Sequence, residues 1–253
     1  VALAAVINAL KLSDKKKENV QIACIGSGAA MLAIIRLLVS WGVGYDQIRL
    51  LDSKGSVDAQ RDDIDEGSEK GTLKSKVQQL GVRGDYESKA VGLKGADICS
   101  AASASVSGGI VDPSIGTTMN DKPIVSALAN PYPEIDPEMA KARGAFIVGT
   151  GRSDFPNQVN NSLGFPGILK GALLVRASKI TDNMAIAAAH SLANYAEKRG
   201  INPDNIVPTM DEADVFPVEA ADVAVQAVKD GVARRPMSWD EAYSIAKKDI
   251  EYS

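Results

Sequence analysis

The chain has 253 residues, of which 45% are hydrophobic and 24% charged, and its formal net charge is −4. This composition is typical of one large or two small globular domains and excludes collagen-like and intrinsically disordered chains. The apolar runs are shorter than the roughly 20 residues of a membrane-spanning helix, and no long basic run is present. We therefore expect neither a membrane segment nor a nucleic-acid partner.

After an apolar helix over residues 1–10, the chain shows one strand-helix-strand unit. Residues 20–25 are apolar and partly β-branched, as in a buried parallel strand, and end at Gly26. Residues 29–41 carry apolar side chains at helical spacing. Residues 47–52 form a second strand pattern, so the unit has the size that a parallel crossover needs.

The alternation of strands and helices continues, which predicts an α/β fold with a doubly wound, parallel, Rossmann-type sheet. Beyond residue 157 only helical patterns follow. We expect a Rossmann core over residues 1–156 and additional C-terminal helices over residues 157–253, which pack on the core or on a missing N-terminal domain. The charged segment 58–71 is interpreted as a solvated loop. The remaining predicted elements are strands at 96–101, 123–129 and 145–149 and helices at 73–80, 137–143, 163–175, 182–199, 218–229 and 239–251.

The cysteines, the single histidine and the first residues predict, respectively, the redox environment, the type of metal ligand and whether the chain is a fragment. Cys24 and Cys99 lie in apolar strand patterns, which predicts buried free thiols and a reducing cytoplasm. His190, the single histidine, lies in a helical run and cannot alone form a His/Cys zinc site, so a metal would need oxygen ligands. The chain begins inside an apolar helix without an initiator Met, and we expect a fragment of a longer protein.

A glycine-rich turn joins the first strand to the next helix. In this context a Gly-x-Gly turn lets backbone amides and a helix N-terminus approach a pyrophosphate. Met31 occupies the third glycine position, where a bulky residue weakens the contact between helix and strand. The predicted cofactor-binding residues of this turn are Gly26, Ser27, Gly28, Ala29 and Ala30.

Asp52 ends the second strand at the distance where dinucleotide-binding proteins carry an acidic residue for the adenosine ribose. A carboxylate there favours NAD over NADP, because it repels a 2′-phosphate. Ser53 and Lys54 follow, and the lysine could instead meet that phosphate or be a simple exposed turn residue. The choice between the two cofactors therefore stays open.

Later strands also end in residues suited to a ligand. Ala102, Ser103 and Ala104 are small and leave room for a flat ring. Asn130 precedes Pro131, and its amide either forms a turn or hydrogen-bonds a carboxamide or substrate oxygen. Neutral amides gather in residues 157–161, where they either cap the next helix or face the active cleft.

Several segments together resemble the C-terminal, dinucleotide-binding half of malic enzymes, particularly the shorter prokaryotic type. The resemblance extends to about Pro236, and its most specific part is the string 150–161 followed by Phe-Pro-Gly. It departs at Met31, where the family usually has Gly or Ala, and at Ser105-Val106, where Pro-Gly is common. The segments are residues 26–30, 51–55, 127–131, 150–161, 165–167 and 231–234.

The resemblance implies oxidative decarboxylation of malate to pyruvate and carbon dioxide, with NAD or NADP and a divalent Mg²⁺ or Mn²⁺. It implies that Asn130 and Asn161 contact malate or the nicotinamide, and that Ala102 to Ala104 contact the middle of the cofactor. The lysine base, tyrosine acid and metal carboxylates of the family have no counterparts here, so we expect no catalytic or metal residue in this chain. It also implies a homo-oligomer.

Two other functions remain open. Another two-domain dehydrogenase, acting on amino acids or folate carriers, shares the sheet and the glycine turn but does not explain the amides of residues 157–161 before Phe165-Pro166-Gly167. A non-catalytic module that senses nucleotides or supports assembly would explain the absence of a local acid and base.

Overall fold

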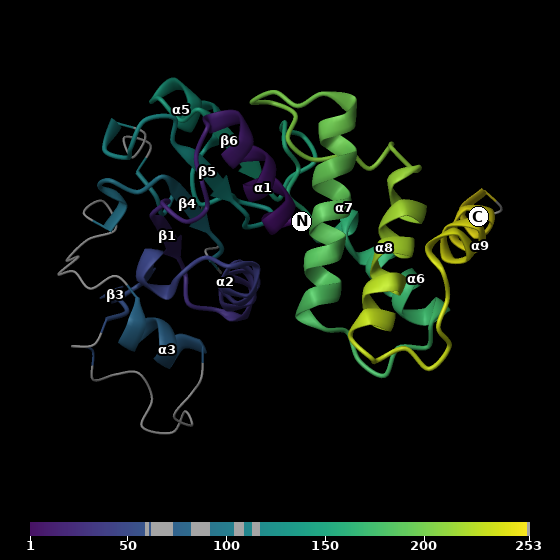
Figure 1. The fold of residues 1–253 in the computed structure, drawn as a ribbon. Helices are drawn as coiled ribbons and strands as arrows, with labels where there is room; N and C mark the ends of the chain where they lie inside the picture. Colours follow the sequence, from purple (N-terminus) through teal and green to yellow (C-terminus); the bar gives the residue numbers. More distant parts are fainter. Residues whose placement is uncertain (59–60, 62–72, 82–91, 104–108, 113–116, 252–253) are drawn as a thin grey trace. The chain divides into compact units, whose positions relative to one another are not determined.

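The computed structural model describes residues 1–58, 61, 73–81, 92–103, 109–112 and 117–251. The chain divides into two compact units. The sheet unit comprises residues 9–158, and the helical unit comprises residues 1–8 and 159–253. Figure 1 shows the elements of both units, coloured along the sequence.

The sheet unit contains a six-stranded sheet in the order β3-β2-β1-β4-β5-β6 (Figure 1). Neighbouring strands are parallel except β2 and β3. The strand order reverses between β1 and β4, and in such sheets ligands bind outside the carboxyl ends of the strands at this switch point. The predicted doubly wound α/β fold is confirmed. The strands are β1 (Ile22–Ile25), β2 (Ile48–Asp52), β3 (Gly55–Ser56), β4 (Ile98–Ala101), β5 (Ile124–Ala127) and β6 (Ile147–Thr150).

The crossover helix α2 (Ala29–Trp41) shows why the local sequence folds as it does. Met31, Ile35 and Leu38 form its buried face. The helix ends at Gly42, whose left-handed backbone lets its amide donate to the carbonyls of the last turn. The other elements with residues in the sheet unit are α1 (Ala2–Ser13), which begins in the helical unit, the 3₁₀ turn η1 (Tyr45–Gln47), α3 (Leu73–Leu80) and α5 (Pro137–Ala142).

In the helical unit, α8 packs against the other three long helices. Small residues allow the close approach: a Cβ on Gly171 would lie 2.4 Å from the carbonyl oxygen of Ala220. The buried Asn8 of α1 donates from Nδ2 to the carbonyls of Ala193 at 2.9 Å and Ile206 at 2.8 Å. The elements after residue 158 are η3 (Asn161–Leu163), α6 (Phe165–Leu174), α7 (Asp182–Arg199), α8 (Val215–Lys229) and α9 (Trp239–Glu251).

The structure differs from the predicted elements mainly at their ends. β3 was not predicted, because a hairpin strand of two residues is too short to show a period. The helix predicted at 163–175 is preceded by a separate 3₁₀ turn and begins at Phe165. The helix predicted from residue 218 begins at Val215, because Pro217 lies in the first turn, where the missing N–H would have no helical acceptor.

Both cysteines are free and fully buried, as predicted. Burial raises the pKa of the Cys24 thiol to about 12 and also raises the pKa of Cys99. His190 lies half-buried on α7. Of the segment 58–71, only Asp58 and Arg61 belong to the described residues. Within the described ranges, no helix has both the length and the apolar character needed to cross a bilayer.

Glu219 on α8 is fully buried, and this gives a prediction for pH. Burial raises the pKa of this carboxyl to about 9, although the amino group of Val1 and the amide of Gly167 favour its charged form. The folded state therefore keeps a proton that the unfolded chain releases near pH 4.5. The Glu219 contribution to the free energy of unfolding should therefore decrease as the pH rises from about 5 to 9, while the buried Val1 amino group, whose pKa burial lowers, acts in the opposite direction.

Urea unfolding at several pH values checks this expectation. In Glu219→Gln the free energy of unfolding should decrease less between pH 5 and 9, because the amide does not titrate. Asp240→Asn, on the exposed side of α9, is the control and should keep the pH dependence of the wild type. An unchanged decline in Glu219→Gln would contradict the assignment.

Candidate functional site

Gly26 directly follows β1 and adopts a conformation that only glycine accommodates well. Its φ is +103°, and a Cβ would lie 2.3 Å from the carbonyl oxygen of Ala102. Its amide donates to the carbonyl of Leu51 at 2.7 Å. Gly26 therefore allows the backbone that leaves β1 to pass close to the ends of the two neighbouring strands, β2 and β4.

Gly28 lies in open space at the start of α2. Among the described residues, a Cβ on Gly28 would meet no atom within 4 Å other than those of its chain neighbours, and Gly28, Ala29 and Ala30 are exposed. Gly28 is the N-cap and offers no side-chain hydrogen bond to the helix. The first amides of α2 lack acceptors within the helix and favour an anion. Met31 is buried on the opposite side, in the core.

Asp52 ends β2 and is held by several donors. The Arg61 guanidinium donates to its two oxygens at 3.0 and 3.2 Å, and the Lys54 amide donates at 2.9 Å. Ser27 Oγ lies at 3.5 Å and Lys74 Nζ at 3.7 Å. Burial alone would raise the pKa of Asp52, but these hydrogen bonds and positive charges outweigh it and hold the pKa below its usual range.

The cations around Asp52 were not predicted. Arg61 lies in the charged segment that we interpreted as a solvated loop, and no sequence pattern linked it or Lys74 to the end of β2. Ser53 and Lys54 lie exposed in the turn between β2 and β3. The charge at this corner of the site is therefore set by Asp52 together with Arg61 and Lys74.

The ends of β4 and β5 lie next to each other, since Ala101 pairs with Ala127. Ala102 and Ser103 follow β4, and Ser103 Oγ is buried without a hydrogen-bond partner among the described residues. Ala104 and Ser105-Val106 lie outside the described residues. Asn130 is exposed and follows β5, and its peptide bond to Pro131 is cis.

Glu134 is a residue of this edge that sequence reasoning missed. It is fully buried, and its oxygens accept hydrogen bonds from the amides of Ser103 at 2.6 Å and Ala129 at 3.1 Å. No pattern marks this role, because Ser103 lies 31 residues away in the sequence. The sheet unit thus brings together the glycine turn, Asp52, Ser103 and Asn130 at the carboxyl edge of the sheet.

The amides of residues 157–161 have different roles. Asn157 is buried with φ +56° and donates from Nδ2 to the carbonyl of Val148 at 3.0 Å, so it shapes the chain after β6. Asn160 caps η3 by accepting a hydrogen bond from the Ser162 amide at 3.0 Å. Asn161 is exposed, and its side chain makes no hydrogen bond within the described part of the chain. The predicted helix, α6, instead has Gly164 as its N-cap, without a side-chain hydrogen bond, so Asn160 caps only the preceding turn and none of these amides caps the helix itself.

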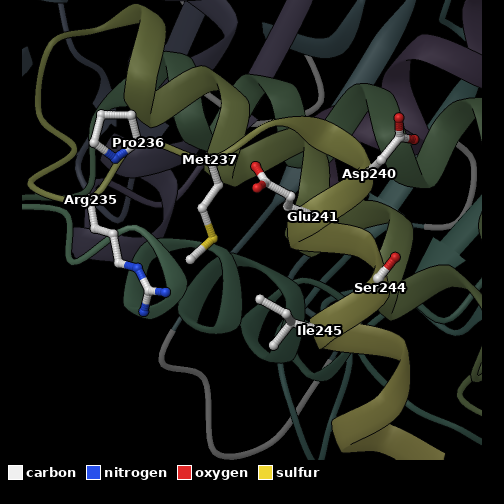
Figure 2. Close-up of a pocket in the computed structure, with 7 residues that line it drawn as sticks. All are labelled: Arg235, Pro236, Met237, Asp240, Glu241, Ser244 and Ile245. Carbon is white, nitrogen blue, oxygen red and sulfur yellow. The ribbon is translucent and has the colours of Figure 1, made fainter.

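A cavity of about 480 Å³ at the start of α9 contains no predicted site residue. Figure 2 shows Arg235 at one end and Asp240 at the other, with Met237 and Ile245 between them. Glu241 is engaged locally, since it accepts a hydrogen bond from the Ser238 amide at 2.8 Å. The described residues also contain no cluster of three His, Cys, Asp or Glu side chains that could hold a metal ion.

The open glycine turn with an acidic residue at the end of the next strand agrees with the comparisons. A family model described as malic enzyme, NAD binding domain, matches residues 1–230. The chain belongs to the malic enzyme family. The resemblance stated from the sequence is confirmed.

Individual malic enzymes match almost the whole chain. It is 40% identical over 252 residues to the bifunctional malic/malolactic enzyme of Bacillus subtilis strain 168, covering 98% of the chain and 58% of that protein. It is 35% identical over 251 residues to the NADP-dependent malic enzyme of Halomonas elongata, covering 93% and 57%. The crystal structure of Entamoeba histolytica malic enzyme superposes with a TM-score of 0.95 at 50% identity, covering 99% of this chain and 51% of that one. The chain therefore spans little more than half the length of these malic enzymes.

Proposed function

We propose that this chain supplies the dinucleotide-binding half of a malic enzyme, which converts malate to pyruvate and carbon dioxide and reduces NAD or NADP. The observation that carries the proposal is the open N-terminus of α2 at Gly28, with Asp52 at the end of the adjacent strand. This arrangement, in a chain of the malic enzyme family, fits a pyrophosphate and an adenosine ribose.

The described residues offer groups for the pyrophosphate, the adenosine ribose and the middle of a dinucleotide. The space at Gly28 and the first amides of α2 would hold the pyrophosphate, and Asp52 with the Ser53-Lys54 turn would hold the adenosine ribose. Ala102 and Ser103 Oγ, which has no hydrogen-bond partner among the described residues, would face the middle of the cofactor. When bound, the nicotinamide accepts a hydride from malate.

We assign to Asn130 and Asn161, whose amides are exposed and neutral, the contacts with malate and with the nicotinamide against which malate lies. A neutral amide can donate to a malate carboxylate and accept from its hydroxyl. We place the base, the acid and the ligands of the divalent metal (Mg²⁺ or Mn²⁺) in segments outside this chain, as the resemblance to malic enzymes implies. The full-length enzyme is proposed to be a cytoplasmic homo-oligomer that binds neither nucleic acid nor membrane. Its buried free thiols suit a reducing compartment, and exposed Phe165 and Leu173 on α6 offer apolar surface for association.

The full-length protein, mixed with malate, Mn²⁺ and each dinucleotide in turn, tests the reaction. We expect pyruvate and the reduced cofactor to form without ammonia or folate, whereas this chain alone should bind the dinucleotide and leave malate unchanged. A full-length protein that binds dinucleotide without converting malate would support the non-catalytic alternative instead.

Asp52→Ala tests the choice of cofactor. If the carboxylate bonds the ribose diol, NAD should bind more weakly by about 1.5–3 kcal/mol, as for a lost hydrogen bond to a charged group. NADP affinity should stay level or rise, because the 2′-phosphate would meet Arg61 and Lys74 without the carboxylate between them. Titration of both dinucleotides measures the two dissociation constants, and equal losses for both would refute this role of Asp52.

A further inference from the structure

Glu134 joins the ends of two neighbouring strands. Beyond the last pairing of β4 with β5, the amide of Leu128 still donates to the carbonyl of Ala101 at 2.9 Å. The next donors, the amides of Ser103 and Ala129, turn instead to the two oxygens of the Glu134 carboxylate. One buried side chain therefore replaces the backbone hydrogen bonds between β4 and β5 at the point where the segments that follow these strands separate.

The chemistry of this contact requires a carboxylate. An ionised carboxylate accepts hydrogen bonds at both oxygens and donates none, and its bonds to backbone amides are strong. A glutamine in the same place would turn an NH₂ group toward one of the two amide donors. The backbone of Glu134 adds a third tie, because its carbonyl accepts a hydrogen bond from the Val111 amide at 3.0 Å.

We propose that Glu134 is a positioning residue for the nicotinamide half of the cofactor. It sets the spacing between the backbone at Ser103 and the backbone at Ala129, which leads into Asn130. This proposal rests on the proposed function, because Ser103 and Asn130 are the residues that we assign to the middle and the nicotinamide end of the dinucleotide. The glycine turn and Asp52, which we assign to the pyrophosphate and the adenosine ribose, make no hydrogen bond to Glu134 in the described structure.

The test compares two ligands in the full-length protein: the complete dinucleotide and adenosine diphosphate, which lacks the nicotinamide half. Glu134→Gln should weaken dinucleotide binding about tenfold, because the strand ends that it positions would shift, and leave binding of adenosine diphosphate within about twofold. Asp136→Ala is the matched control. It removes the exposed N-cap of α5, whose carboxylate accepts from the Met139 amide at 2.9 Å, and so lowers stability without touching either strand end.

Both affinities should stay at wild-type values in Asp136→Ala. If Glu134→Gln does not fold, Glu134→Asp, which keeps the charge on a shorter arm, is subject to the same comparison and the same expectation. Unchanged dinucleotide affinity, or an equal loss for both ligands, would overturn the positioning role. A wild-type protein that binds neither ligand would instead overturn the proposed function, and the role of Glu134 with it.

Discussion

Replacing Gly28 by valine is expected to weaken dinucleotide binding by more than ~10-fold while the protein stays folded. Apart from its two chain neighbours, no atom of the described residues lies within 4 Å of a Cβ built on Gly28, and its backbone angles of φ −78° and ψ 175° suit any residue. A valine side chain would therefore disturb no neighbour in the chain. It would fill the space in which we place the pyrophosphate.

Gly26 provides the contrast. A side chain there would collide with the Ala102 carbonyl and would also be strained by the positive φ, so Gly26→Ala should lower the melting temperature. Circular dichroism and cofactor titration of both variants separate the two effects. A folded Gly28→Val protein with wild-type affinity would refute the pyrophosphate site.

Asn161→Ala is expected to reduce kcat/KM for malate by at least about tenfold in the full-length enzyme, because a lost hydrogen bond to a charged group costs ~1.5–3 kcal/mol. The cofactor should still bind, since the substitution changes no charge. Stability should also stay close to that of the wild type, because the exposed Asn161 side chain makes no hydrogen bond within the described part of the chain.

The neighbouring Asn160 is the matched control for this experiment. Asn160→Ala removes the cap of η3 and should lower stability by about 1 kcal/mol, while the folded fraction keeps normal malate kinetics. Melting temperature and kcat/KM, measured for both variants, distinguish the two roles. Normal kinetics in Asn161→Ala would leave Asn130 as the remaining amide that we assign to the substrate.

Local patterns were sufficient to predict most of the fold. Both ends of the helix at 29–41 were predicted correctly, because the residues of its buried face and its terminal glycine lie within one short segment. The parallel sheet followed from the alternation of strands and helices. The hairpin strand β3 was missed because it has only two residues. The start of α8 was misplaced because proline breaks a helix interior but is accommodated in a first turn, where Pro217 lies.

The candidate site was predictable only where its residues are close in sequence or follow a fixed spacing. The glycine turn and Asp52 meet this condition. Glu134 and Arg61 do not, because their partners are identified by the folded chain and not by any repeat or motif. Which of the two adjacent asparagines, Asn160 or Asn161, caps η3 likewise became clear only from the backbone geometry, since composition does not distinguish two identical residues.

The burial of the two thiols has a practical consequence. Cys24 and Cys99 are the only cysteines in the sequence, lie on the adjacent strands β1 and β4, and are inaccessible to a reagent in solution. Chemical labelling of either one requires these strands to open transiently. The rate of labelling therefore reports how often the sheet opens transiently at its switch point. Because the native cysteines serve as the probes, the same measurement shows whether a bound nucleotide slows that opening.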